Sequence, residues 1–257
     1  MIDKEKFLDY NFVVSESIEQ VALSILEYQY DINTNILPII FTPNVDYIVK
    51  LNNSKFHEIR ERLKKSAFIL PDGQPIIWAS KFYKGRIITR LAGSDLFSHL
   101  YRLIKKRQTA SLFLTSGQSV SNFYQQDFPT GHILTLPYID PEKNIEFEKI
   151  IDESVNLINN NNIKYVFIGV SFPKQDKIAL GIFDKLKTNG YKNIPVLALI
   201  GASLEFEAGI KKRAPVIFQK IGLEWFFRFL LEPKRLFKRY FIDSFQFIKI
   251  VRMNKNV

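Results

Sequence analysis

Short apolar runs that alternate with amphipathic stretches are the feature that most constrains the fold of this 257-residue chain. Runs rich in Ile, Val, Leu and Phe predict strands, which we expect at 36–42, 67–70, 111–115, 132–136, 165–169 and 196–201. Between them the helical spacing of apolar residues predicts helices at 17–28, 45–52, 55–64, 74–82, 94–106, 120–126, 147–160 and 174–188. Such alternation predicts an α/β fold, with a Rossmann-like, mostly parallel sheet and helices on both faces.

The residues from 217 to 257 differ in character from the rest of the chain. They contain nine basic and three acidic residues, a net charge of 9 − 3 = +6 out of a formal +10, among many Phe, Leu and Ile. No apolar run there approaches the roughly 20 residues that span a bilayer. A basic, aromatic segment of this kind suits the membrane interface. The alternative is a helical pair that packs on the core and keeps its basic side in water.

We therefore divide the chain into an α/β core at 1–210 and a basic, amphipathic, membrane-associating helical appendage at 211–257. The absence of cysteine excludes disulfides, thiolate metal sites and a cysteine nucleophile. The first residues form no continuous apolar segment, so we expect no secretory signal and a cytoplasmic location. A pI near 9.5 indicates an anionic partner, which could be a nucleotide, a nucleic acid or an acidic lipid.

Small and polar residues follow several of the predicted strands. In parallel α/β sheets ligands bind at the carboxyl ends of the strands, and helix N-termini there suit a phosphate. Each segment alone is also an ordinary turn, but together they predict a nucleotide pocket. The segments are Thr42-Pro43-Asn44, Pro71-Asp72-Gly73-Gln74, Thr115-Ser116-Gly117-Gln118, 169–175 and Gly201-Ala202-Ser203.

Several common motifs are missing from the sequence. It has no Walker A pattern, no G-x-G-x-x-G and no G-x-S-x-G turn. It also has no Asp-x-Asp, so the usual carboxylate pair for a divalent metal and a nucleotide diphosphate is missing. His57, His99 and His132 share no ligand spacing, and we interpret them as structural.

Seven segments, read in order, form a specific combination. They are Thr42-Pro43-Asn44-Val45-Asp46, Leu70-Pro71-Asp72-Gly73, 90–96, 169–176, 208–215, 222–228 and Glu232-Pro233-Lys234-Arg235. Through them the chain resembles the WecG/TagA/CpsF glycosyltransferase family over most of its length. It departs from the family pattern at Asp176, where Glu is usual, at Glu205 in Ser203-Leu204-Glu205, where an Asp is common, and at Thr115-Ser116-Gly117, where the family has a Gly-Gly pair.

The resemblance implies an inverting, metal-independent glycosyltransferase without a cofactor. Such an enzyme moves an N-acetylmannosamine-type sugar from a UDP donor to a polyprenyl-diphosphate-linked N-acetylglucosamine, in cell-surface polysaccharide or teichoic acid synthesis. It works as a peripheral protein at the inner face of the plasma membrane. The expected partners are therefore the UDP-sugar donor, the lipid-linked acceptor and an anionic membrane surface, and not a nucleic acid.

The resemblance also suggests roles for individual residues. Asp72 matches the family's proposed catalytic aspartate, and its place between a strand and a helix suits a base for the acceptor hydroxyl; the alternative is an Asp-Gly turn. Thr42 and Asn44 match pocket positions that touch the donor sugar or the acceptor, with a helix cap as the alternative, and Gln175 can hydrogen-bond a sugar or phosphate. We expect Thr42 and Gln175 to act with Asp72 in catalysis and Asn44 to bind substrate. The other expected substrate-binding residues of the core are Gly73, Arg90, Gly93, Gly169, Lys174, Gly201 and Glu205.

Without a metal, the charge of the leaving diphosphate must be met by backbone N–H groups, arginine or lysine. Arg213, Arg228, Arg235 and Arg239 lie in the appendage. We hypothesise that membrane docking folds the appendage over the pocket and brings one or more of them onto the diphosphate. The alternative is that they only bind lipid headgroups.

Two other classes of function stay open from the residues alone. A non-enzymatic, membrane-associated nucleotide-binding protein would keep the pocket without turnover. Charge alone would also allow a nucleic-acid binder, but the basic residues are mixed with bulky apolar ones and no recognised nucleic-acid module is present.

Overall fold

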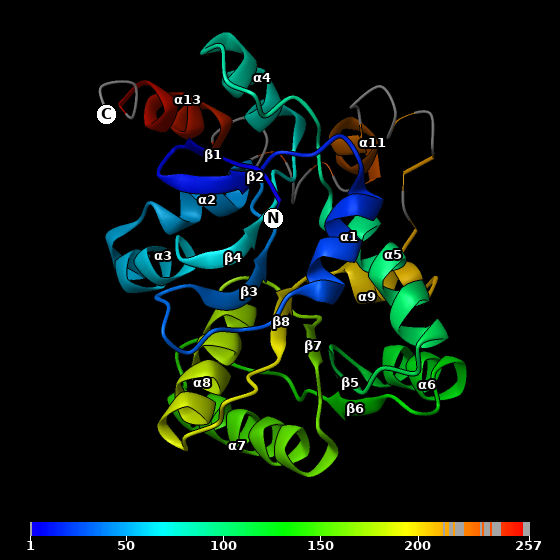
Figure 1. Ribbon diagram of the computed structural model, residues 1–257. Coiled ribbons are helices and arrows are strands. Elements are labelled where there is room, and N and C mark those ends of the chain that lie inside the picture. Colours follow the sequence, from blue (N-terminus) through cyan, green and yellow to red (C-terminus); the bar gives the residue numbers. More distant parts are fainter. Residues whose placement is uncertain are drawn as a thin grey trace.

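The computed structural model describes residues 2–212, 214–215, 218, 224–231, 233, 237 and 243–253. Its strands form one sheet in the order β1-β2-β4-β3-β8-β7-β5-β6 (Figure 1). Every neighbouring pair is parallel except β1 and β2. The strands are β1 (Lys4–Phe7), β2 (Tyr10–Val13), β3 (Leu37–Phe41), β4 (Ser66–Ile69), β5 (Ser111–Thr115), β6 (His132–Thr135), β7 (Tyr165–Ile168) and β8 (Val196–Leu199).

Helices cover both faces of the sheet, which confirms the predicted mixed α/β class. One face packs against α2 (Val45–Leu51), α3 (His57–Leu63), α4 (Gln74–Phe82), α7 (Asn144–Asn161), α8 (Lys174–Thr188) and α13 (Asp243–Met253). The other packs against α1 (Ile18–Glu27), α5 (Gly93–Lys106), α6 (Gln118–Asp127) and α9 (Ser203–Glu207). The remaining described helices are the 3-10 turn η1 (Ser54–Phe56) and α11 (Glu224–Leu231).

The central strands are apolar along their whole length because both of their faces are covered. In β3, Ile39 and Phe41 enter one core cluster, whereas Ile40 between them enters the other. The same alternation divides Leu197 and Leu199 of β8 from Ala198. A strand buried on both faces in this way fixes its register, because a slip of one residue would exchange the two side-chain sets.

The sequence did not predict the β1–β2 hairpin at the amino end. Each of its strands is only four residues long. The turn between them places Leu8 at φ 52° and Asp9 at φ 63°. Two positive φ values are the geometry of a two-residue hairpin turn that usually carries Asn-Gly or Asp-Gly. Leu-Asp lacks that sequence signal, so the hairpin went unrecognised.

The described parts of the appendage are mainly helical. Phe247, Ile250 and Val251 of α13 are buried in the core cluster that also contains α2, and Figure 1 shows α13 and α4 at the same end of the molecule. No helix in the described part of the chain is long and apolar enough to cross a membrane. The division at 210/211 stays a prediction.

Candidate active site

The carboxyl ends of the parallel strands meet at one edge of the sheet, and several predicted site residues lie there. Thr42 follows β3, Asp72 follows β4 and Gly201 follows β8, and these strands are neighbours in the order β4-β3-β8. The Thr42 hydroxyl donates a hydrogen bond to the Leu199 carbonyl at 3.3 Å, which joins the ends of β3 and β8. This edge is where α/β sheets bind ligands.

Asp72 is held in place through both its backbone and its side chain. Its N–H donates to the Pro43 carbonyl at 3.1 Å. Its Oδ2 accepts a hydrogen bond of 3.4 Å from the N–H of Gly93, the first residue of α5. The carboxylate is partly buried, so it is positioned by the fold but open to a ligand. This arrangement suits a base that accepts a proton from a bound hydroxyl.

Gly93 lies so close to Thr42 that a larger residue does not fit. A Cβ atom added to Gly93 would lie 2.8 Å from the Thr42 hydroxyl oxygen. The close approach brings the end of β3 and the start of α5 together beside Asp72. Gly93 therefore shapes the site through packing, and its N–H contributes through the contact with Asp72.

Asn44 acts as the N-cap of α2, with its Oδ1 accepting a hydrogen bond from the Tyr47 N–H at 3.1 Å. This is the helix-cap alternative named above, and it orients the residue at the same edge as Asp72. Gly73 has a φ of 151°, which residues with a side chain rarely adopt, and a Cβ atom added there would lie 3.8 Å from Cβ of Asn44. The turns after β3 and β4 are thus in contact.

Gln175 joins three segments through its amide group. Its Nε2 donates to the Tyr47 hydroxyl at 3.0 Å, and its Oε1 accepts from the Gly201 N–H at 3.1 Å. The Tyr47 hydroxyl in turn donates to Oδ1 of Asp176. This chain of hydrogen bonds connects the first turn of α2, the start of α8 and the turn after β8.

The Asp176 carboxyl is fully buried. Burial raises its pKa from 3.8 to about 7, and the hydrogen bond from Tyr47 opposes the rise. Its second oxygen, Oδ2, has no hydrogen-bond partner among the described residues. Burial also raises the pKa of the Tyr47 hydroxyl well above its usual value, so that Tyr47 stays a donor.

The structure gives other predicted residues partners or packing roles of their own. Lys174 lies over the Tyr138 ring, with Nζ 5.1 Å from the ring centroid. Glu205 pairs with Lys211 at 2.6 Å and accepts a hydrogen bond from Ser116 at 3.3 Å. These contacts join Lys174, the first residue of α8, to the segment after β6, and Glu205, in α9, to the turn after β5. None of them joins either residue to Asp72.

Arg90 and Gly169 are placed by packing as well. The Arg90 guanidinium lies 3.9 Å from the Asp95 carboxylate, on the segment that leads into α5. A Cβ atom at Gly169 would lie 2.4 Å from Cδ1 of Leu204. The absence of a side chain at Gly169 therefore allows α9 to pack against the end of β7. The roles of both residues toward a substrate stay predictions.

The predicted appendage arginines lie largely outside the described residues. Arg213, Arg235 and Arg239 are not described. Arg228 belongs to α11, but its side chain is not described. Their proximity to the site is therefore a prediction only.

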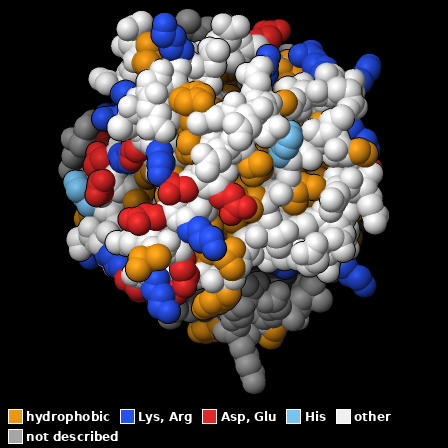
Figure 2. Space-filling model, turned by 90° about the horizontal axis from the view of Figure 1, so that it is seen from below, with side chains coloured by type: hydrophobic (Ala, Val, Ile, Leu, Met, Phe, Trp, Pro, Cys, Tyr) orange, Lys and Arg blue, Asp and Glu red, His pale blue; other side chains and the backbone are white. Residues whose placement is uncertain are grey.

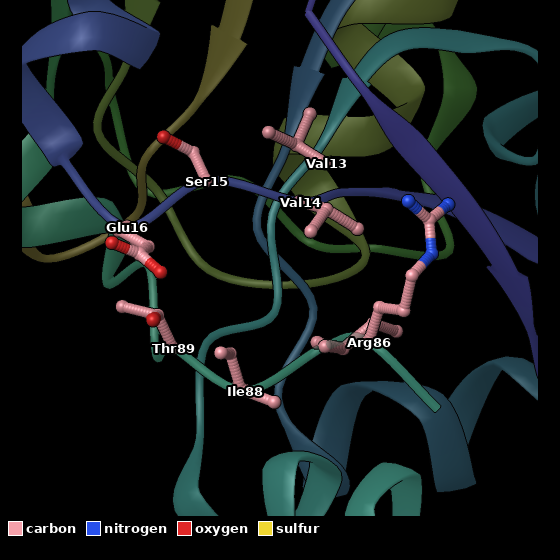
Figure 3. Close-up of a pocket in the computed structure, with 8 residues that line it drawn as sticks. Val13, Val14, Ser15, Glu16, Arg86, Ile88 and Thr89 are labelled. Carbon is pink, nitrogen blue, oxygen red and sulfur yellow. The ribbon is translucent and has the colours of Figure 1, made fainter. Parts of the chain in front are cut away.

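A cavity of about 150 Å³ lies between the segment after β2 and the loop before α5 (Figure 3). It is lined by Val13, Val14, Ser15, Glu16, Arg86, Ile87, Ile88 and Thr89, and it contains none of the predicted site residues. Arg86 is engaged by ion pairs with Asp3 and Glu5. We do not assign the substrate to this cavity.

Sequence reasoning did not single out Tyr47 as a site residue, and it noted Asp176 only as a departure from the family pattern. Tyr47 resembled a core position of a short helix, and it is buried in the core. The one available signal was an acidic residue at the start of α8 on a position that the helix buries.

Comparison with known proteins identifies the family of the chain. The model of the glycosyl transferase WecG/TagA/CpsF family matches residues 12–256. An N-acetylglucosaminyldiphosphoundecaprenol N-acetyl-beta-D-mannosaminyltransferase of Staphylococcus aureus strain MRSA252 is 26% identical over 202 residues, which cover 77% of this chain and 74% of that protein. The protein of the same name from strain NCTC 8325 / PS 47 has the same identity and coverage. The chain thus belongs to the glycosyl transferase WecG/TagA/CpsF family and is a glycosyltransferase.

Proposed function

We propose that this glycosyltransferase moves an N-acetylmannosamine-type sugar from a UDP donor to a polyprenyl-diphosphate-linked N-acetylglucosamine, for cell-surface polysaccharide or teichoic acid synthesis. The observation that carries the proposal is the Asp72 carboxylate, held by the Gly93 N–H beside Thr42 at the carboxyl edge of the sheet. The sugar and the lipid-linked acceptor are those named for the two relatives from Staphylococcus aureus.

The reaction is a single displacement with inversion. Asp72 accepts the proton of the acceptor hydroxyl while the hydroxyl oxygen attacks the anomeric carbon of the donor sugar. The bond from that carbon to the diphosphate breaks, and UDP leaves with the electron pair. Asp72 serves as the general base of this step.

The transfer proceeds without a metal ion. The sequence has no Asp-x-Asp, and the described residues contain no group of three His, Asp or Glu side chains arranged to ligate one. Activity should survive EDTA. Loss of activity on chelation, with recovery on adding Mg²⁺ or Mn²⁺, would refute metal independence and leave the transfer reaction itself standing.

Charge on the departing diphosphate is stabilised instead by Arg213, Arg228, Arg235 or Arg239, when the appendage folds over the pocket at the membrane. Replacing each arginine by alanine separates this role from headgroup binding. Replacement of a diphosphate-binding arginine should lower turnover on a soluble acceptor analogue in the presence of liposomes and leave liposome binding unchanged. If none of the four variants does so, these arginines serve the membrane alone.

The protein works as a peripheral protein on an anionic membrane at the inner face of the plasma membrane. Support comes from α4, which starts directly after Asp72 and Gly73 and exposes Trp78 by 55% and Phe82 by 79%. Lys81 and Lys84 are exposed on the same segment. Tryptophan at an interface and lysine near anionic lipid both favour membrane contact.

The α13 helix provides a second surface that exposes large apolar side chains together with basic ones. Phe245, Ile248 and Met253 are exposed, together with Lys249 and Arg252. Its buried residues hold it on the core, as described above. Contact of α4 and α13 with the bilayer would bring the Asp72 turn toward the surface from which a lipid-linked acceptor extends.

An assay of UDP release with a lipid-linked N-acetylglucosamine acceptor tests the proposal. We expect release that depends on the acceptor and on a UDP-linked N-acetylmannosamine donor. Tight UDP-sugar binding with no acceptor-dependent release would instead favour the non-enzymatic nucleotide-binding alternative.

A further inference from the structure

Tyr47 and Asp176 form a buried link that fixes the position of Gln175. The link begins at the Asp176 carboxyl, passes through the Tyr47 hydroxyl and reaches the Gln175 amide. Gln175 is only 4% exposed and Asp176 is 0% exposed, so water competes little for these hydrogen bonds.

The Gly201 N–H fixes the direction of the hydrogen bonds in this link. A backbone N–H can only donate, so Oε1 of Gln175 faces Gly201 and Nε2 of Gln175 faces the Tyr47 hydroxyl. The Tyr47 oxygen accepts from Nε2, and the Tyr47 hydroxyl proton is directed to Oδ1 of Asp176.

The contact of Gln175 with Gly201 sets the turn after β8. Gly201 has a φ of 51°, and its N–H is shared between the Gln175 Oε1 at 3.1 Å and the Ile168 carbonyl at 3.2 Å. The turn lies between the ends of β3 and β7, because β8 is the strand between them. A shift of Gln175 would therefore move the backbone at the centre of the candidate site.

We propose that Tyr47 and Asp176 are positioning residues, which hold Gln175 and the Gly201 turn in the shape that binds the sugar donor. The proposal rests on the proposed function for its kinetic consequence, because the donor is the ligand whose binding it affects. Its structural consequence, a fixed Gly201 turn, is independent of which sugar is transferred.

The test compares Tyr47→Phe with Tyr101→Phe. The control tyrosine is also a buried side chain that donates to an aspartate, with its hydroxyl 2.6 Å from Asp127 Oδ2, but this aspartate is partly exposed and the bond joins α5 to α6 away from the Asp72 edge. Each substitution removes one hydroxyl from one tyrosine–aspartate pair. Tyr101→Phe should lower thermal stability less than Tyr47→Phe, because Asp127 keeps its hydrogen bond from Lys105 whereas the buried Asp176 carboxyl loses the donor to its Oδ1.

Only Tyr47→Phe should change the site. We expect faster amide hydrogen exchange at the Gly201 turn and a roughly tenfold lower kcat/KM for the UDP donor, a modest loss for misplaced binding groups. In a Gln175→Ala background the same substitution should cause no further loss, since residues that act through one group do not add their effects. Asp176→Asn, which retains an acceptor for Tyr47, should keep more activity than Asp176→Ala.

Two results would overturn the proposal. One is unchanged exchange at the Gly201 turn in Tyr47→Phe. The other is a full additional loss of kcat/KM when Tyr47→Phe is combined with Gln175→Ala. If the wild-type protein shows no transfer with any UDP-sugar, the proposed function fails, whereas the exchange measurement still decides whether the link fixes the turn.

Discussion

At the scale of the residue, the strongest prediction is the loss of turnover when Asp72 is replaced. Asp72→Asn keeps an oxygen that can accept from the Gly93 N–H, so the turn should fold as before. The amide cannot take the acceptor proton, and turnover should fall by roughly 10²–10⁴-fold, the usual range for a general base. Steady-state kinetics, with UDP binding and thermal unfolding as controls, measure this. Turnover near that of the wild type would exclude Asp72 as the base, and a collapsed melting temperature would indicate a structural turn.

Asp176 makes a separate prediction about stability and pH. Burial raises its pKa to about 7 from 3.8, so between these values the folded state keeps a proton that the unfolded state releases. Below about pH 4 the carboxyl is protonated in both states, and burying it does not reduce the free energy of unfolding through titration. As the pH rises from about 4 to 7 the free energy of unfolding falls, by at most about 1.4 kcal/mol per pH unit, because the unfolded state releases this proton first. Asp176→Asn removes this dependence.

Urea unfolding at pH 4.5 and 7.5 checks the sign. Relative to the wild type, Asp176→Asn should become more stable as the pH rises. Asp127→Asn is the control, because a hydrogen bond from Lys105 lowers the pKa of Asp127 instead of raising it. If the difference between wild type and Asp176→Asn is the same at both pH values, the buried carboxyl does not titrate in this range.

At the scale of the element, we propose that α4 connects the base to the membrane. Trp78→Ser combined with Phe82→Ser should weaken binding to anionic liposomes by roughly tenfold or more, because burying each aromatic side chain contributes about 1.5–3 kcal/mol. Co-sedimentation with liposomes measures the change. Ile32→Ser with Ile36→Ser is the matched control, since these exposed residues precede the amino end of β3. Equal binding by both double variants would remove α4 from the membrane contact.

The elements also show what the sequence could and could not predict. Long periodic segments were predictable, and α4 and α8 have the bounds expected from their apolar spacing. The β1–β2 hairpin was missed because its strands are short and its turn carries no glycine. The link from Tyr47 to Asp176 was missed because it depends on two helices meeting in space. Spacing along the chain does not report such a meeting.

At the scale of the whole molecule, the sheet brings the turns after separate strands together at one edge. The faces of the molecule differ in the kinds of side chain that they expose. The face seen from below in Figure 2 has acidic and basic side chains side by side. The end that carries α4 and α13 instead exposes large apolar residues with lysine and arginine. If the protein binds an anionic bilayer as proposed, this difference would favour a single orientation, with the Asp72 edge toward the lipid-linked acceptor.

The most direct measurement of this account is the identity of the product. Purified protein is incubated with an α-linked UDP-N-acetylmannosamine and a polyprenyl-diphosphate-linked N-acetylglucosamine, in EDTA, with Asp72→Asn as the control. Mass spectrometry and NMR should show one added N-acetylhexosamine of the manno configuration in β linkage, with little product from the control. An α-linked product would contradict inversion, and transfer by Asp72→Asn equal to the wild type would contradict the proposed site.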